Sequence, residues 1–340
     1  MLRYTMQQQT VCAIIVTYNR KHLLLECLEG LRRQNRPVEA VYVIDNSSAD
    51  GTPQELLEAG FISEHPDEDL QRPCELSSSV LSADSEKTIQ LIYIRMPGNV
   101  GATGGFHEGM RRAYDRGFSW FWLMDDDVEP MPHALQKMLS YSNIGQCIQP
   151  TKRFLDGETF SDHAYFDLSF GKMAFLKESE FSRFNDFSCK NYGTFEGMLI
   201  SRDVVKEIGL PDARFFFIGD DFIYGLLASL HTNNILIKES LFIKKLKRDA
   251  PKSLFGIKSV RLRNMEIYYY TRNMFLIYEY LKKLGTLSRF AYISHLWYVI
   301  KASAGIIFFE GSPYRLYLLY KGFIDGLLKR YNRLDCQYYP

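Results

Sequence analysis

The fold class of this chain follows from one stretch, Trp120-Phe121-Trp122-Leu123-Met124-Asp125-Asp126-Asp127-Val128-Glu129-Pro130. Its apolar run predicts a buried strand, and the strand ends in three consecutive carboxylates. Adjacent like charges repel and resist burial, so the triplet needs either a cation or a solvated loop. A hard divalent metal that bridges the carboxylates to a diphosphate would supply this compensation. A solvated acidic turn is the alternative, and the triplet alone does not separate the two.

Three upstream apolar runs, at residues 11–17, 41–45 and 90–95, also end in polar residues. Parallel strands of a doubly wound sheet present ligand groups in this way, at their carboxyl ends. The third run leads into the glycine-rich segment 98–106. Its glycines permit close backbone approach to a ligand, and the helix expected after it begins with free N–H groups suited to phosphate.

This ordered set of motifs resembles the family 2 glycosyltransferases, in particular bacterial galactofuranosyl- and rhamnosyltransferase-like members. The resemblance covers roughly residues 10–275 and is carried by residues 16–20, 45–52, 98–106, 125–127, 195–202, 209–211 and 215–221. It implies an α/β fold of the glycosyltransferase A type, a doubly wound and mostly parallel sheet with a C-terminal helical module. We expect a catalytic domain over residues 8–250, with a surface insertion at about 61–88, and a basic, aromatic helical module over 251–340.

The resemblance also implies roles for individual residues. Contacts to the donor nucleotide are expected from Thr17, Asn19, Arg20, Asp45, Asn99, Gly104, Gly105, Asp125 and Asp126. Asp45 would bind the uracil or ribose, and the Gly104-Gly105 backbone would flank the diphosphate. Asp127 would be the principal ligand of Mg²⁺ or Mn²⁺, and Asp125 would face both the ribose and the metal. The metal would stabilise negative charge on the departing diphosphate.

The transfer also needs a base that takes the proton of the acceptor hydroxyl. The resemblance places this base at Asp221 and acceptor binding at Asp220. The preceding Phe215-Phe216-Phe217 and the pairing of the two charges can both raise a carboxyl pKa towards a useful value. The alternative is that one aspartate caps the helix expected over residues 222–227.

Two departures from the family pattern affect the predicted site. Members commonly carry a histidine metal ligand some two dozen residues after the base, where this chain has Lys244-Lys245. Two alternatives follow: the metal has fewer protein ligands, or a cation such as Lys245 partly replaces it. The nearest histidine, His231, is expected at a helix end. Ile223 stands where relatives tend to have another acid, so acceptor recognition is expected to differ.

Composition excludes some classes of protein. A net charge of +1 argues against a general nucleic-acid binder. Six scattered cysteines, without a Cys-x-x-Cys pair, favour a reducing cytoplasm and argue against structural zinc. The first nine residues lack an apolar core of signal-peptide length, so export by that route is not expected. The acidic, serine-containing segment 64–86 reads as a surface insertion between strands.

The C-terminal third combines a basic run over residues 244–272 with many aromatic residues. Residues 290–309 match the length of a membrane span, but His295 and Lys301 near the middle make spanning costly. A helix lying in the interface tolerates them, which suggests peripheral docking on the anionic inner face of the cytoplasmic membrane. The alternatives are a solvated basic face with a helical cap on the catalytic core, or a contact in a homo-oligomer.

The sequence thus predicts an inverting, metal-dependent glycosyltransferase. UDP-galactofuranose is the favoured donor, and a glycan or lipid-linked glycan for a surface polysaccharide is the expected acceptor. A rhamnosyltransferase that uses dTDP-rhamnose is the rival. A catalytically degenerate nucleotide-sugar-binding subunit is the alternative from another class, and the presence of Asp127 and Asp221 favours the enzyme. A nucleotidyltransferase is disfavoured, because a basic glycine-rich loop does not follow the first strand.

Overall fold

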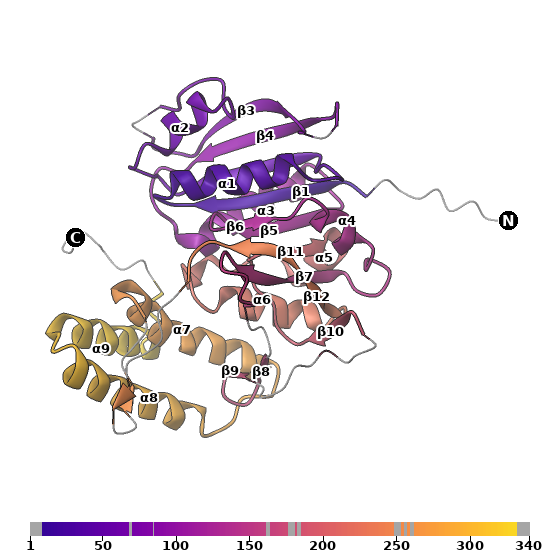
Figure 1. The fold of residues 1–340 in the computed structure, drawn as a ribbon. Coiled ribbons are helices and arrows are strands. Elements are labelled where there is room, and N and C mark those ends of the chain that lie inside the picture. The colour runs from indigo at the N-terminus through magenta and orange to yellow at the C-terminus, as the bar shows by residue number, and fades with distance from the viewer. Residues whose placement is uncertain are drawn as a thin grey trace.

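The computed structural model describes residues 9–67, 70–83, 85–160, 164–175, 181, 185–247, 253–254, 257–258 and 262–331. A large sheet forms the centre of the molecule, helices cover both of its faces, and three long C-terminal helices pack at one end (Figure 1). The last three are α7 (Asn264–Lys283), α8 (Ala291–Phe309) and α9 (Pro313–Leu327).

The central sheet has the strand order β10-β12-β7-β11-β5-β1-β2-β4-β3, and β6 pairs with β12 beside this path. The bounds are β1 (Val11–Thr17), β2 (Ala40–Asp45), β3 (Cys74–Leu81), β4 (Thr88–Arg95), β5 (Trp120–Asp125), β6 (Val128–Pro130), β7 (Cys147–Phe154), β10 (Phe187–Lys190), β11 (Met198–Ser201) and β12 (Asn234–Lys244). Strands β4, β2, β1 and β5 run parallel, as do β7 and β12, whereas β3, β10 and β11 run antiparallel to their neighbours. The predicted mostly parallel, doubly wound sheet is confirmed.

Strand β1 explains why helices are needed on both faces. Successive side chains of a strand point to opposite faces, and every residue of β1 is buried and nearly all are apolar. Its odd-numbered residues join one core with α1 (Lys21–Arg32), and its even-numbered residues join a second core with α3 (Gly101–Asp115). The smaller helices are α2 (Thr52–Glu58), α4 (Ala134–Leu139), α5 (Arg202–Ile208), the 3₁₀ turn η1 (Ala213–Phe215) and α6 (Asp220–Ser229).

The predicted surface insertion contains an element that the sequence did not indicate. Residues 74–81 form β3, which pairs antiparallel with β4 along its whole length and closes one edge of the sheet. This strand was not predicted because it contains three consecutive serines, and an edge strand with one solvent-exposed face shows little apolar periodicity. Residues 68, 69 and 84 of the same segment lie outside the described residues.

The C-terminal helical region is also as predicted. Helix α7 is largely buried and packs against α9 and the region around α6. The expected boundary at residue 250, and residues 248–252 and 259–261 of the basic run, lie outside the described part of the chain. Two small hairpins complete the fold: β8 (Ala164–Asp167) with β9 (Lys172–Phe175), and β13 (Ser253–Leu254) with β14 (Ile257–Lys258).

Candidate active site

The carboxyl ends of three parallel strands bring the predicted donor residues together. Thr17 ends β1, Asp45 ends β2 and Asp125 ends β5. The registers pair Thr17 with Asp45, and Val16 with Asp125. Side chains that are separated by up to about a hundred residues in sequence thus meet at one edge of the sheet.

A cluster of three carboxylates forms beside this edge. Asp125, Asp127 and Glu196 each offer an oxygen, and these oxygens all lie within 4.8 Å of one another. Asp127 Oδ1 is buried and has no hydrogen-bond partner among the described residues. An orphaned buried carboxylate oxygen in an all-oxygen set fits a hard divalent cation such as Mg²⁺ or Mn²⁺.

Glu196 was not predicted as a member of this cluster. Strand β11 runs antiparallel to β5 with Met198 opposite Leu123, so the residues before β11 lie beside the end of β5. Gly197 N donates to Leu123 O at 2.9 Å, which extends this pairing towards Asp125. The pairing is long-range, and only the acid within the motif 195–202 could have pointed to it.

Two lysines compensate part of this negative charge. Lys244 forms an ion pair with Glu196 and places its Nζ 3.7 Å from Asp127 Oδ1. Lys152, which is buried, lies 3.4 Å from the other Glu196 oxygen. Burial alone would raise the pKa of Glu196, but the two ammonium groups outweigh it and lower the pKa to about 2.

The expectation that Lys245 supplies a positive charge at the metal site was wrong. Lys245 Nζ binds Glu26 at 2.7 Å and Glu129 at 2.5 Å. Successive residues of a strand edge face opposite sides, and the pairing of Lys244 with Val128 in β6 turns Lys244 rather than Lys245 towards the triplet. His231 lies just after α6, where its N–H bonds Ala228 O, as expected for a helix end.

The members of the Asp triplet have different surroundings. Asp126 accepts hydrogen bonds from Thr17 Oγ1 at 2.8 Å and Arg20 Nη1 at 2.9 Å, and it is nearly inaccessible. Burial raises its pKa to about 6, although Arg20 and Thr17 oppose the rise. Burial, followed by the charges of Asp127 and Glu196, raises the pKa of Asp125 well above its ordinary value. Asp126 therefore ties β1 to β5. Asp127 Oδ2 lies 3.5 Å from Arg20 Nη1, whereas its Oδ1 accepts no hydrogen bond from the described residues.

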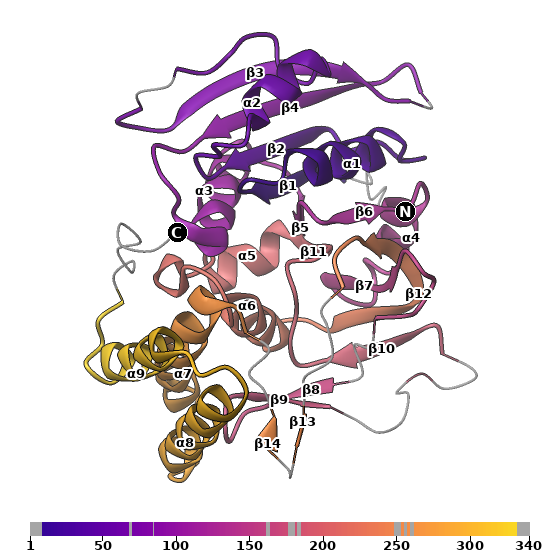
Figure 2. The ribbon, with the colours of Figure 1, turned by 60° about the vertical axis from the view of Figure 1, so that its left-hand side comes forward.

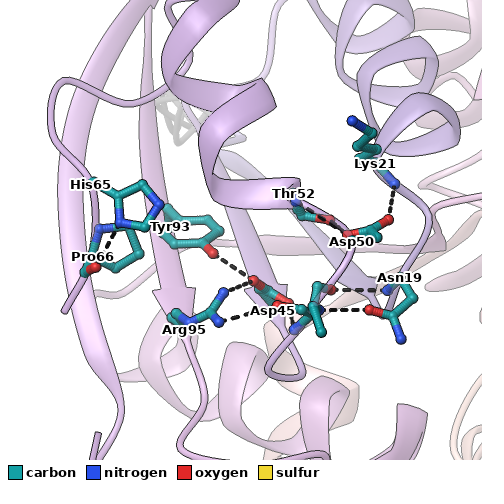
Figure 3. A network of polar contacts seen from close by, with 11 residues as sticks. Asn19, Lys21, Asp45, Asp50, Thr52, His65, Pro66, Tyr93 and Arg95 are labelled. Carbon is teal, nitrogen blue, oxygen red and sulfur yellow. Dashed lines mark hydrogen bonds and ion pairs between the residues drawn. The ribbon is translucent and has the colours of Figure 1, made fainter. Parts of the chain in front are cut away.

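Asp45 lies at the centre of a second network (Figure 3). Its Oδ2 accepts from Tyr93 OH at 2.5 Å and Arg95 Nη1 at 3.0 Å, and its Oδ1 accepts from Ser48 N at 2.8 Å. Asp45 is fully buried, whereas Arg95 remains partly exposed. Asn19, with a left-handed φ of 54°, accepts from Ala49 N through its side chain. The network fixes the loop that follows β2.

The glycine-rich segment has a different structure from the one expected. Gly104 and Gly105 lie inside α3, where a Cβ on Gly105 would lie 2.6 Å from Val16 Cγ1. Gly105 lets the helix pack closely on β1, whereas a Cβ on Gly104 would lie 2.8 Å from Val100 Cγ2. Asn99 Oδ1 accepts from Gly101 N at 2.8 Å, and Thr103 N donates to Phe216 O at 3.0 Å. Two of the N–H groups at the start of α3 are thus already bonded, which leaves fewer for a phosphate.

The acid pair Asp220-Asp221 begins α6, near the carboxylate cluster. Asp220 is buried, and its Oδ2 accepts from Thr103 Oγ1 at 2.6 Å. Asp221 is partly exposed, and its Oδ1 accepts from Phe222 N at 2.8 Å. Burial, and then the charge of Asp220, raise the pKa of Asp221 well above its ordinary value, with smaller contributions from Glu196 and Asp125. The helix-cap position itself is taken by Gly219.

The loop before the acid pair is held in an unusual conformation. Phe216 and Ile218 both have positive φ, at 65° and 72°, which is strained for an aromatic and a β-branched residue. Asn273 Nδ2 on α7 lies within hydrogen-bond distance of three loop carbonyls, those of Phe215 (2.9 Å), Phe217 (2.8 Å) and Ile218 (2.9 Å). Helix α7 therefore positions the loop that delivers the acid pair. Asn273 was not predicted to have a role at the site.

Comparison with known proteins relates this geometry to other chains. Galactofuranosyltransferase GlfT1 of Mycolicibacterium smegmatis is 27% identical over 221 residues, which cover 63% of this chain and 63% of that protein. GlfT1 of Mycobacterium tuberculosis is 25% identical over 218 residues, covering 63% and 62%. The match thus spans somewhat less than two thirds of the length of these curated relatives.

Solved structures share the fold at low sequence identity. S. aureus TarS in complex with UDP-GlcNAc has a TM-score of 0.52 at 13% identity, covering 95% of this chain and 82% of that one. GalNAc-T7 with UDP, GalNAc and Mn²⁺ has a TM-score of 0.53 at 13% identity, covering 79% and 48%. These likenesses establish the glycosyltransferase A-type fold alone. The model of the family described as "Glycosyltransferase like family 2" matches residues 8–266, and the chain belongs to that family.

Proposed function

We propose that this chain transfers galactofuranose from UDP-galactofuranose to a hydroxyl of a glycan acceptor, with inversion and with the help of Mg²⁺ or Mn²⁺. The observation that carries the proposal is the convergence of Asp125, Asp127 and Glu196 beside the acid pair at the start of α6. The similarity to GlfT1 supports galactofuranose as the transferred sugar.

Asp127, Asp125 and Glu196 would hold the divalent cation. Such a cation, when bound, stabilises the negative charge that develops on the departing diphosphate. Arg20 is shared between Asp126 and Asp127, and Lys152 and Lys244 face the cluster. When all are ionised, the four carboxylates of Asp125, Asp126, Asp127 and Glu196 exceed these three cations by one negative charge, which would attract a cation. Lys244, beside Asp127, would also meet a donor phosphate.

The predicted donor residues fall into two groups under this proposal. Asn19, which is exposed, and Arg20 and Asp125, which are partly exposed, would contact the nucleotide. Arg95, which was not predicted, is also partly exposed and would join them. Thr17, Asp45 and Asp126 are buried and hold the others in place, Asp45 through Arg95 and Asp126 through Arg20. Direct contacts to the donor from Asn99, Gly104 and Gly105 remain predictions.

Asp221 is the proposed base. Its raised pKa makes it a better proton acceptor than an exposed aspartate, and it is more exposed than Asp220. Asp220, fixed by Thr103, would orient acceptor hydroxyls. Once deprotonated, Asp221 takes the acceptor's proton as that oxygen attacks the anomeric carbon from the face opposite UDP. Displacement on an α-linked donor then gives a β-linked product.

A lipid-linked glycan of a surface polysaccharide is the proposed acceptor, and the cytoplasm is the proposed compartment. The five cysteines that the structure describes are all free thiols, which agrees with a reducing environment.

A donor panel tests the proposal. Purified protein with Mn²⁺ is offered UDP-galactofuranose, UDP-galactopyranose, UDP-GlcNAc and dTDP-rhamnose, and nucleotide release is measured with and without EDTA. We expect metal-dependent release that is fastest with UDP-galactofuranose. Preferred use of dTDP-rhamnose would support the rival donor. If the protein binds UDP but releases nucleotide from none of these donors, even with a glycan acceptor added, a non-catalytic subunit is supported.

A further inference from the structure

Helices α8 and α9 lie at the end of the molecule opposite β3 (Figures 1 and 2), and each carries exposed apolar side chains. We call this set the α8–α9 face and define it by the exposed side chains of Ile293, Trp297, Ile300, Ile307, Tyr317 and Ile324. Their spacings of three, four and seven residues within each helix place them along one side of that helix. Ile293 and Ile307 are each 63% exposed, and Trp297 is 56% exposed.

The fold does not need these side chains for its own core. The inner side of α8 is buried through Val299, Ala302 and Ile306, which share a cluster with Leu319 of α9. His295 is buried on the same inner side and lies against the ring of Phe323. Rows of exposed apolar side chains on two neighbouring helices indicate an interaction site.

The charges beside the face indicate the partner. Arg289, Lys301 and Arg330 are exposed, and all three are basic. Among the acids nearby, Glu310 forms an ion pair with Arg315, and Asp325 is buried. An apolar stripe with Trp and Tyr, flanked by cations, complements the interface of an anionic lipid layer. Two copies of the chain would instead bring like charges together.

We propose that the α8–α9 face lies in the interfacial region of a bilayer that contains anionic lipids. Helix α8 is long and apolar enough to cross a membrane by length and composition, with a mean hydropathy of 1.3, and a third of that stretch is buried in the fold. Crossing would break these buried contacts and place Lys301 in hydrocarbon. Lying in the interface keeps the inner side of α8 packed and immerses only its outer side.

Vesicle flotation of the full chain tests this proposal. Vesicles of phosphatidylcholine with and without phosphatidylglycerol are used at low and high salt. We expect the parent protein to float with the anionic vesicles and to bind less at high salt. Ile293→Glu combined with Trp297→Glu should lower the bound-to-free ratio at least roughly tenfold, because two immersed side chains become charged. Lys301→Gln combined with Arg289→Gln should lower the preference for anionic lipid.

The matched control is Leu81→Glu, which introduces a glutamate on β3 at a site that is also 63% exposed. This variant should float like the parent. All variants should keep the parent melting temperature and UDP affinity, so failure of the membrane proposal is distinguishable from failure of the proposed activity. Unchanged flotation of the Ile293/Trp297 variant overturns the proposal. So does a parent dimer that this variant converts to a monomer without any change in vesicle binding, since a second copy would then cover the face.

Discussion

The Nζ of Lys244 lies 3.7 Å from Oδ1 of Asp127, and the same ammonium is ion-paired with Glu196. A lysine ammonium therefore sits where a divalent cation would share the same carboxylates. A metal that enters the cluster must displace this ammonium or tolerate its repulsion, whereas the side chain of Lys245 next to it points to Glu26 and Glu129.

We expect Lys244→Gln to tighten Mn²⁺ binding by about tenfold, because a unit charge a few ångströms from the ion is removed in a partly buried site. Lys245→Gln is the matched control and should leave Mn²⁺ affinity unchanged. Isothermal titration calorimetry with Mn²⁺ alone measures both. Weaker binding in Lys244→Gln would indicate that the lysine organises the carboxylates instead of competing with the ion.

Substitutions in the Asp triplet test which aspartate is a metal ligand and which one has a structural role. Asp127→Ala should abolish Mn²⁺ binding and transfer while it preserves the fold, because the lost group is a ligand at the end of a strand. At pH 4.5, where Asp126 is protonated in the folded chain, Asp126→Asn should instead lower stability by about 1–2 kcal/mol, since it weakens the contacts with Thr17 and Arg20. Calorimetry with Mn²⁺ and chemical unfolding separate the two effects. Near-normal turnover of Asp127→Ala would remove Asp127 from the metal site.

The sequence alone predicted those features that depend on residues close to one another along the chain. The apolar runs ended by Thr17, Asp45 and Asp125 predicted three parallel strands, because fully buried strands need no alternation and their ends carry the polar groups. The position of the acid pair before a helix was also visible, since Asp220 and Asp221 precede a helical apolar pattern.

What the sequence could not provide is the register between distant strands. Glu196 reaches Asp125 only because β11 pairs antiparallel with β5, and Lys244 reaches Asp127 only because β12 pairs with β6. A shift of one residue in either pairing would turn the side chain to the other side. For this reason Lys245, and not Lys244, was wrongly predicted to lie beside the Asp triplet. The role of Asn273 was hidden for the same reason, since its partners lie about 55 residues upstream.

The buried carboxyls predict how stability depends on pH. The pKa of Asp126 is about 6 in the folded chain against 3.8 for an ordinary aspartate, so the folded state holds its proton more tightly. Stability should therefore fall as pH rises from about 4 to 6, by up to about 3 kcal/mol from this group. Glu196, with a pKa of about 2, acts in the opposite direction but only below about pH 4.5.

Thermal unfolding in EDTA at pH 4.5, 5.5 and 6.5 measures this dependence. Asp126→Asn should flatten it, because asparagine does not titrate. Mn²⁺ should raise the melting temperature more at pH 6.5 than at 4.5, since protons compete for its ligands. A melting temperature in EDTA that rises steadily over this range would contradict the assigned burial of these acids.

Asp221 and Asp220 should respond differently to the same change. Asp221→Asn keeps shape and hydrogen bonding but cannot accept a proton, so transfer should fall by about 10²–10⁴-fold while UDP affinity persists. Asp220→Asn should weaken acceptor binding more than it slows chemistry. If Asp221 only supported the helix start, asparagine would leave rate and stability almost untouched. Single-turnover rates, UDP affinity and melting temperature decide between the two roles.

Asn273 should control the acid pair without touching the substrate. Asn273→Ala removes the donor that faces three carbonyls of the strained loop, so the variant should lose about 2–4 kcal/mol of stability. Relaxation of the loop at Phe216 and Ile218 would move Asp221, and kcat should fall while UDP affinity stays near the parent value. The control is Thr271→Val, two residues away on α7, whose hydroxyl bonds only Ile267 O among the described contacts. It should keep kcat. Equal loss of kcat in both variants, at equal stability, would show that α7 supports the site only through general packing and that the Asn273 contacts do not position the base.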